Sequence, residues 1–155
     1  MADDEQARAA AMQRLDAFAG VWTLEASFPG GRIAGRAVFE WALDRQFMAQ
    51  RSEAPDSGVP DSMAIVGYDP GRGAYLQHYF DSRGVTRVYA MDFTDGVWTL
   101  MRDAPDFTAL EFSQRFIGTF SADGLRIDGR WEKSAASGGD WKHDFDLTYT
   151  KVSRS

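Results

Sequence analysis

The two histidines of the chain, His78 and His143, are the side chains best suited to proton transfer near neutral pH. His143 lies in the run Trp141–Tyr149, where apolar and polar residues alternate with the period of two that is typical of a strand. This alternation predicts that His143 faces the interior together with Phe145. There it would pair with a polar neighbour, act as an acid, base or hydrogen-bond donor to a ligand, or ligate haem. Aromatic residues surround His78 on both sides, so the direction of its side chain stays open.

Arg51 is a candidate for binding an anion, because a guanidinium recognises carboxylates and phosphates with two parallel hydrogen bonds. Its strand is ambiguous: Arg51 shares one face with Phe47 and Ala49, and the opposite face carries Met48 and Gln50. An inward Arg51 would be a buried charge that needs a carboxylate or an anionic ligand. An outward Arg51 on a solvated face is the more common arrangement for arginine, and we favour it.

Several chemistries are disfavoured by composition and spacing. The chain has no cysteine, which excludes disulfides, thiolate catalysis and cysteine metal sites. Two histidines without a His-x-His or HExxH pattern predict no metal site. No nucleophile motif such as GxSxG or SxxK is present, and no acidic pair has the spacing of a glycosidase dyad. A net charge of -6 argues against nucleic acid and anionic membranes as partners.

The first part of the chain predicts one helix over Asp3–Phe18. Alanine is abundant there, glycine and proline are absent, and acidic residues occupy the first turn, where the helix dipole favours them. Gly20 then ends the helical pattern. The acidic start lacks the features of a signal peptide, and no apolar stretch is long enough to span a bilayer. We therefore expect a cytoplasmic protein.

Everything after Gly20 predicts strands separated by short turns rich in glycine, aspartate and proline. No second helical pattern follows, so a parallel sheet with crossover helices is not expected. We predict an all-β fold, a single up-and-down antiparallel β-barrel of about ten strands, with the N-terminal α-helix closing one end. Residues 1–19 would form the helix, 20–152 the barrel and 153–155 a tail. The expected strands are Val21–Ser27, Ile33–Ala42, Phe47–Glu53, Ser62–Asp69, Ala74–Asp81, Val85–Asp92, Val97–Arg102, Leu110–Phe120, Leu125–Ser134 and Trp141–Lys151.

The pentapeptide GVWTL occurs twice, at Gly20–Leu24 and at Gly96–Leu100. Apart from one proline at the same offset, the residues that follow the two copies do not match. Glycine after a turn, followed by valine, tryptophan and threonine, is typical of the start of a strand. The repeat therefore predicts two strand starts rather than a duplicated unit.

The first copy carries a family resemblance. Gly20-Val21-Trp22, a Gly-x-Trp motif after a helix at the start of strand one, is similar to the calycin superfamily of lipocalins and fatty-acid-binding proteins. The motifs FEW, FMAQR, IVGYDP, YFDSRG, GRWE and the ending WKHDFDLTYTKV follow in order between Phe39 and Val152. Together they resemble a bacterial family of small calycin-like barrels known only as a domain of unknown function. The resemblance implies the barrel fold and assigns no chemistry.

Two other barrel families suggest what to look for. Fatty-acid-binding proteins hold a ligand carboxylate with an Arg-x-Tyr pair on the last strand; here the strand reads Leu147-Thr148-Tyr149, with the tyrosine but without the arginine. Nitrobindins ligate haem through a histidine near the C-terminus, a place that His143 could take. Their first strand carries Gly-x-Trp-x-Gly-x-Gly, and the second and third glycines are missing from this chain.

These observations predict a binding protein for a small, largely apolar or amphipathic molecule in an aromatic-lined cavity, since a ten-stranded barrel is too wide for side chains to fill. The alternatives are a cofactor-independent isomerase or cyclase with His78, His143 and Tyr149 as acid–base groups, a haem protein ligated by His143, and an interaction or homodimerisation module. Apart from that haem alternative, no cofactor is expected. Most aromatics should be core. The candidate ligand-binding residues are Trp22, Phe39, Trp41, Arg51, His78, Tyr89, Trp131, His143 and Tyr149.

Overall fold

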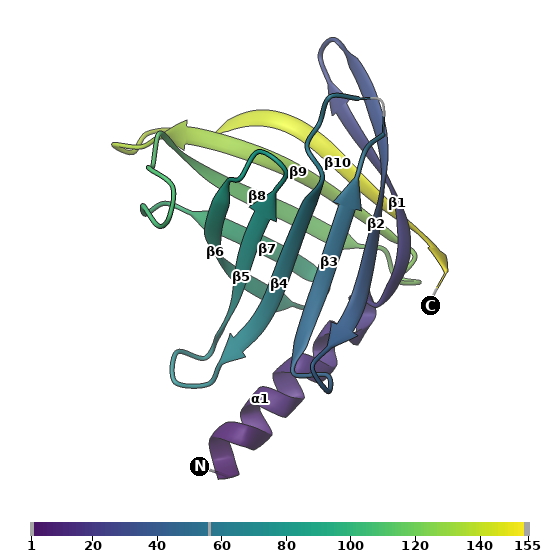
Figure 1. Cartoon of the computed structure of the whole chain (residues 1–155), viewed down its shortest axis with the longest axis vertical. Coiled ribbons are helices and arrows are strands. Elements are labelled where there is room, and N and C mark those ends of the chain that lie inside the picture. The colour runs from purple at the N-terminus through teal and green to yellow at the C-terminus, as the bar shows by residue number, and fades with distance from the viewer. Residues whose placement is uncertain (1, 56, 154–155) are drawn as a thin grey trace.

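The fold is described from a computed structural model, which places residues 2–55 and 57–153 (Figure 1). A helix, α1 (Ala2–Arg14), continues into a short 3-10 turn, η1 (Leu15–Phe18). Ten strands follow: β1 (Gly20–Phe28), β2 (Gly31–Ala42), β3 (Phe47–Glu53), β4 (Ser62–Asp69), β5 (Ala74–Asp81), β6 (Thr86–Thr94), β7 (Val97–Arg102), β8 (Phe112–Phe120), β9 (Arg126–Ala135) and β10 (Lys142–Ser153). No expected strand end is displaced by more than two residues.

The ten strands form one closed antiparallel barrel in which each strand pairs with its neighbours in sequence. The barrel closes where β1 pairs with β10, for example through Leu24 and Tyr149. The predicted all-β up-and-down barrel with an N-terminal helix is therefore confirmed. Closure gives each of these ten strands a partner on both sides, which protects the sheet from pairing with other chains. β10 continues through Ser153, where the tail was expected to begin, and residues 154–155 lie outside the described part.

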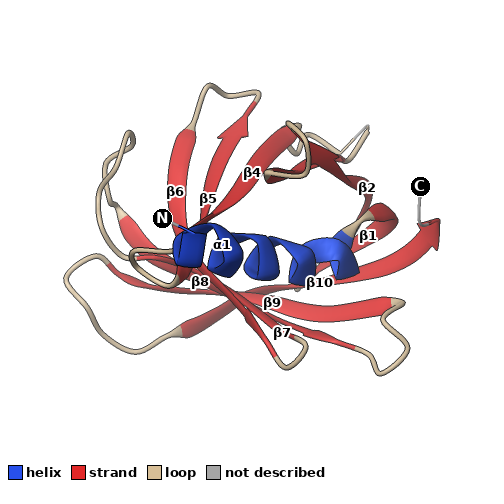
Figure 2. Ribbon diagram, turned by 90° about the horizontal axis from the view of Figure 1, so that it is seen from below, coloured by secondary structure: helices blue, strands red, loops and turns tan. Residues whose placement is uncertain are grey.

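The N-terminal segment packs against one end of the barrel, where Figure 2 shows α1 lying across the opening. Ala11, Met12 and Leu15 are buried there. The Tyr75 hydroxyl donates a hydrogen bond of 2.6 Å to the carbonyl oxygen of Ala11, which ties β5 to the helix. No helix in the described part of the chain is both long and apolar enough to cross a membrane.

The closed end is filled by an aromatic cluster centred on Phe18, the last residue of η1. Its ring lies 4.9 to 5.3 Å from the rings of Phe39, Phe93, Trp98 and Phe120, measured between centroids. Most of these contacts are edge-to-face, the arrangement that the ring quadrupoles favour. This end of the barrel is solid core, so any internal space lies above it.

The two GVWTL copies lie at the starts of β1 and β7, as predicted for two strand starts. Both tryptophans are buried inside the barrel, Trp22 at 0% and Trp98 at 2% exposure. The Trp22 indole donates to the carbonyl oxygen of Phe18 at 2.8 Å, whereas the Trp98 indole nitrogen is buried without a partner among the described residues. The same pentapeptide therefore places Trp22 in a hydrogen bond with the backbone and leaves the indole N–H of Trp98 without a described acceptor.

Candidate functional site

A cavity of about 360 Å³ occupies the half of the barrel that lies away from the helix. Its floor includes Trp98, Phe116 and Tyr149, three buried aromatic side chains, of which Trp98 also belongs to the Phe18 cluster. Its mouth lies among the turns at the other end, where Phe28 and Val59 contribute to the lining. The alternation of β-strands places one side chain in two inside the barrel, and around this cavity those side chains are mainly aromatic and aliphatic.

The aromatic walls are packed against one another. The Trp98 ring lies 4.8 Å from Phe116 and 5.6 Å from Tyr149, and the Trp131 ring lies 5.2 Å from Phe116 and 5.8 Å from Tyr89. Because each ring is held by others, the wall is a fixed surface rather than a set of mobile side chains.

The Phe116 ring fits because two glycines face it from paired positions on β8 and β9. Gly118 pairs with Gly129, and a Cβ at Gly118 would lie 2.8 Å from the Phe116 ring. A Cβ at Gly129 would overlap that ring even more closely. Glycine inside a strand is typical of a place where another group approaches the backbone closely. Here it lets Phe116 lie flat against the wall and leaves the space above it open.

One side of the cavity carries a polar cluster of Arg87, Tyr89 and Gln114. The carbonyl oxygen of the Gln114 side chain accepts hydrogen bonds from Arg87 Nη1 at 3.3 Å and from the Tyr89 hydroxyl at 3.0 Å. Within the described residues, Arg87 Nε is buried and has no hydrogen-bond partner, as is also true of Trp98 Nε1. Buried donors in proteins are nearly always paired, so two unpaired donors in the walls of one cavity need an explanation.

A second polar group lies around Gln50. Its amide nitrogen donates to Ser52 Oγ at 3.1 Å and to the Tyr149 hydroxyl at 3.4 Å. Burial raises the pKa of Tyr149 to about 12, although the Gln50 hydrogen bond opposes the shift. Burial likewise raises the pKa of Tyr89. Both phenols are therefore neutral at physiological pH and can orient a ligand, but neither is a ready proton acceptor.

At the mouth, Arg83 is neutralised by Asp81. Arg83 Nη2 lies 2.7 Å from Asp81 Oδ2, which also accepts a hydrogen bond from the Tyr79 hydroxyl at 2.9 Å. Burial raises the pKa of Asp81, but the hydrogen bonds from Arg83 and Tyr79 outweigh it and lower the pKa to about 2. Arg87 differs: within the described residues it forms no ion pair, and the cavity lining includes no aspartate or glutamate.

Three of the nine candidate residues, Tyr89, Trp131 and Tyr149, line the cavity. Trp22 and Phe39 face inward but lie in the core at the closed end. Trp41 lies beside the helix, where its indole nitrogen donates to Asp16 at 3.0 Å. Of the candidate aromatic residues, the structure therefore brings only Tyr89, Trp131 and Tyr149 together around the cavity.

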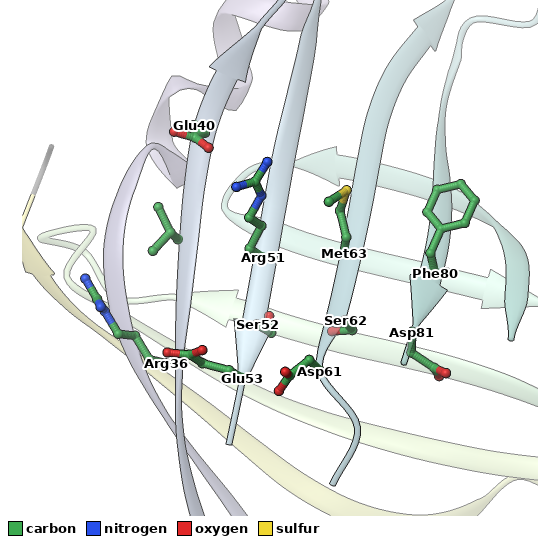
Figure 3. A pocket seen from close by; sticks show the side chains of 11 residues that line it. Arg36, Glu40, Arg51, Ser52, Glu53, Asp61, Ser62, Met63, Phe80 and Asp81 are labelled. Atoms are coloured by element: carbon green, nitrogen blue, oxygen red, sulfur yellow. The ribbon is translucent and has the colours of Figure 1, made fainter. Parts of the chain in front are cut away.

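Arg51 faces outward, as favoured from the sequence, because Gln50 and Ser52 take the inward positions of β3. It lines a groove of about 530 Å³ on the outer face of β2 to β5 (Figure 3). The groove also carries acidic residues, among them Glu40 and Glu53. The alternative in which Arg51 binds a ligand inside the barrel is wrong.

Both histidines lie outside the barrel. His78 is exposed on the outer face of β5. The prediction that His143 faces the interior is wrong: its side chain is 54% exposed and lies 2.9 Å from Asp146 Oδ1. A register shift between His143 and Phe145 pairs His143 with Glu132 and Phe145 with Trp131. The extra residue reverses the alternation before Phe145, so the inward set begins only there.

These positions decide two chemical alternatives. A haem inside the cavity could not reach His143, and none of the residues that line the cavity is a histidine, so the residues present do not fit a histidine-ligated haem. The described residues also hold no cluster of three or more histidine, aspartate or glutamate side chains suited to a metal ion. The proposed acid–base set of His78, His143 and Tyr149 is wrong as a set, because only Tyr149 faces the cavity.

Several polar residues of the cavity were not singled out from the sequence, among them Gln50, Gln77, Arg87 and Gln114. A signal for them was present. Arg87 alternates with Tyr89, Met91 and Phe93, all on one face of β6. A polar residue in step with buried apolar ones marks an interior polar position, and a polar position inside a barrel needs a hydrogen-bond partner.

The closed barrel and its aromatic cavity define a calycin-like fold. The crystal structure of Rv2717c from M. tuberculosis is similar, with a TM-score of 0.60 over 92% of this chain and 97% of that chain. The two sequences are 18% identical, so this similarity shows a shared fold alone. The chain matches no protein-family model, and no curated protein matches it in sequence.

Proposed function

We propose that this barrel binds a small, largely apolar molecule inside its cavity. The observation that carries the proposal is the cavity itself: about 360 Å³ of space bounded by packed aromatic rings above a solid core. Such a volume lies at the lower end of the range for ligand pockets in proteins, roughly 300 to 1,000 Å³. A ligand of this size would gain affinity mainly from burial of its apolar surface, at about 25 cal/mol per Å².

The resemblance to the calycin-like family of unknown function belongs to the same proposal, supported by the order of its motifs and by the shared barrel fold. An isomerase or cyclase in this cavity would have to work with neutral phenols and amides, since Tyr79, Tyr89 and Tyr149 all have a raised pKa caused first by burial. Neutral phenols and amides are suited to binding and orienting a ligand by hydrogen bonds, so we propose a binding protein.

The test uses a neutral, hydrophobic fluorescent dye, N-phenyl-1-naphthylamine, and one substitution that fills the cavity. Ala64 lines the cavity on β4, and Ala64→Leu would place three more carbon atoms there. Ala90 is exposed on the outer face of β6, so Ala90→Leu is the matched control. We expect the dye to bind the wild type and Ala90→Leu equally and to bind Ala64→Leu at least tenfold more weakly. Equal binding to all three proteins would place the dye elsewhere and overturn the proposal.

A further inference from the structure

We propose that the cavity ligand is a monocarboxylate, with its apolar body against the aromatic walls and its carboxylate on Arg87. This inference rests on the proposed binding function and names the class of ligand. The charge of the cavity wall supports it. The protein carries a net charge of -6, yet its cavity lining contains two arginines, Arg83 and Arg87, and no acidic residue.

The charges around Arg87 are already matched with one another. Asp81 lies 2.7 Å from Arg83 at the mouth, and Asp106 lies 2.9 Å from Arg102 in the loop after β7. Arg87 itself donates to the neutral Gln114 amide and, within the described residues, has no carboxylate beside it. One positive charge is therefore left over in a mostly apolar cavity. Arg87 is partly buried, so its charge is partly desolvated without a counter-ion, and an anionic ligand would supply the missing charge.

The unpaired donors point to the same conclusion. Among the described residues Arg87 Nε is buried without a partner, while Gln114 uses its oxygen for both Arg87 and Tyr89. Gln77, which is 3% exposed and faces the cavity, makes no side-chain hydrogen bond with the other described residues. This side of the cavity thus has more donors than acceptors. A carboxylate has two acceptor oxygens, no donor and one negative charge, which matches a single unpaired arginine.

The opposite wall fixes the rest of the ligand. Leu24 and Leu147 line the cavity there, on β1 and β10, and neither side chain is charged. Trp98 lies on the floor of the cavity, and its indole nitrogen is buried without a partner among the described residues. A ligand with one charged end and an apolar ring or chain matches both walls, whereas a dianion would leave one negative charge without a partner.

The test compares naphthalene-2-carboxylate with naphthalene-2-carboxamide, which has nearly the same shape without the charge. Both are titrated at pH 7 into the wild type by calorimetry. We expect the carboxylate to bind about 10- to 100-fold more tightly, the range expected for a charge-assisted hydrogen bond. Equal affinities would overturn the carboxylate proposal and leave the binding function intact. If neither compound binds while the neutral dye does, the carboxylate proposal fails in the same way; if the dye also fails, the binding function itself is wrong.

Two variants then test whether Arg87 causes the preference for the carboxylate over the carboxamide. Arg87→Met keeps the length of the side chain and removes its charge, and Arg51→Met removes the same charge from the outer groove. We expect Arg87→Met to bind both compounds with similar affinity and Arg51→Met to keep the wild-type preference. If Arg87→Met does not fold, Arg87→Gln provides a polar replacement with the same expected loss. A preference that survives removal of the Arg87 charge would overturn the assignment to Arg87.

Discussion

The arginines on the inner faces of the strands differ in whether they form an ion pair with a carboxylate. Arg102 is 3% exposed and is held by Asp106, which also accepts hydrogen bonds from the backbone nitrogens of Val88 and Thr108. Arg87 donates to the Gln114 amide instead. The first arrangement is a structural pair that holds the loop after β7. Arg87 has no such ion pair among the described residues, and in the proposal a ligand carboxylate supplies the partner.

Removing the Arg87 charge should therefore not destabilise the empty protein. Arg87 is partly buried, and replacing a partly buried charge that has no counter-ion by an apolar side chain of similar length is often neutral or stabilising. We expect the melting temperature of ligand-free Arg87→Met to equal or exceed that of the wild type, as measured by circular dichroism. A drop of more than about 5 °C, which for a domain of this size corresponds to roughly 1.5 kcal/mol or more, would show that Arg87 has a structural role.

Asp106→Asn should have the opposite effect, because it leaves Arg102 buried without its counter-ion. We expect a loss of about 3 kcal/mol in the free energy of unfolding at pH 7, measured with urea. The hydrogen bonds from Arg102 hold the pKa of Asp106 well below its ordinary value, against the effect of burial. The stabilisation is thus fully present above the unfolded carboxyl pKa of about 3.9 and is lost as the pH falls through the lower folded pKa. The gap between the wild type and Asp106→Asn should shrink below about pH 3; a gap that stays constant would contradict this account.

At the scale of elements, the glycine pair of β8 and β9 shapes the cavity by letting Phe116 lie against the wall. Gly129→Ala should displace that ring, because the new Cβ would overlap it and would also lie 2.9 Å from the backbone oxygen of Leu147. Overpacking of this kind costs roughly 1 to 3 kcal/mol. We expect a loss of about 2 kcal/mol in stability and at least tenfold weaker binding of N-phenyl-1-naphthylamine.

Gly30→Ala is the control, since Gly30 lies in an exposed turn where an added Cβ would have no other atom within 4 Å. This variant should bind the dye as the wild type does. If Gly129→Ala also binds normally, Phe116 does not limit the space in the cavity.

The strands were predictable because their period of two survives in the sequence, and most of their ends are turns with glycine, proline or aspartate. The outward direction of Arg51 was favoured because arginine usually lies on a solvated face, since the alternation on its strand was ambiguous. The direction of His143 was not predictable, because the register shift before Phe145 depends on how β10 pairs with β9. Alternation within one strand cannot reveal an extra residue that only the partner strand defines. The role of Arg87 could not be predicted for a related reason: its lack of an ion pair among the described residues depends on Asp81 and Asp106 being taken by other arginines.

At the scale of the whole molecule, the barrel has a packed half and a half that contains the cavity. The half near α1 is packed with aromatic side chains and the buried residues of the helix, and the other half holds the cavity. Stability should therefore depend on the first half without a matching effect on binding. Leu15 is fully buried under the helix and does not line the cavity, so it separates the two properties.

Leu15→Ala should cost about 3 kcal/mol in stability, the usual range for a buried leucine, which a urea titration would measure. Its affinity for the neutral dye should stay within twofold of the wild-type value as long as the protein is folded. A large loss of affinity in the folded variant would show that the closed end controls the shape of the cavity.

The most direct test of ligand binding in the cavity is a two-dimensional NMR titration that follows the five indole N–H signals with naphthalene-2-carboxylate. The account predicts large shifts for Trp98, whose nitrogen is unpaired on the floor, and for Trp131 in the wall. Trp22 and Trp41 are hydrogen-bonded near the helix and should barely move. Shifts confined to the tryptophans outside the cavity, or no shifts at all, would contradict the claim that this barrel binds its ligand inside.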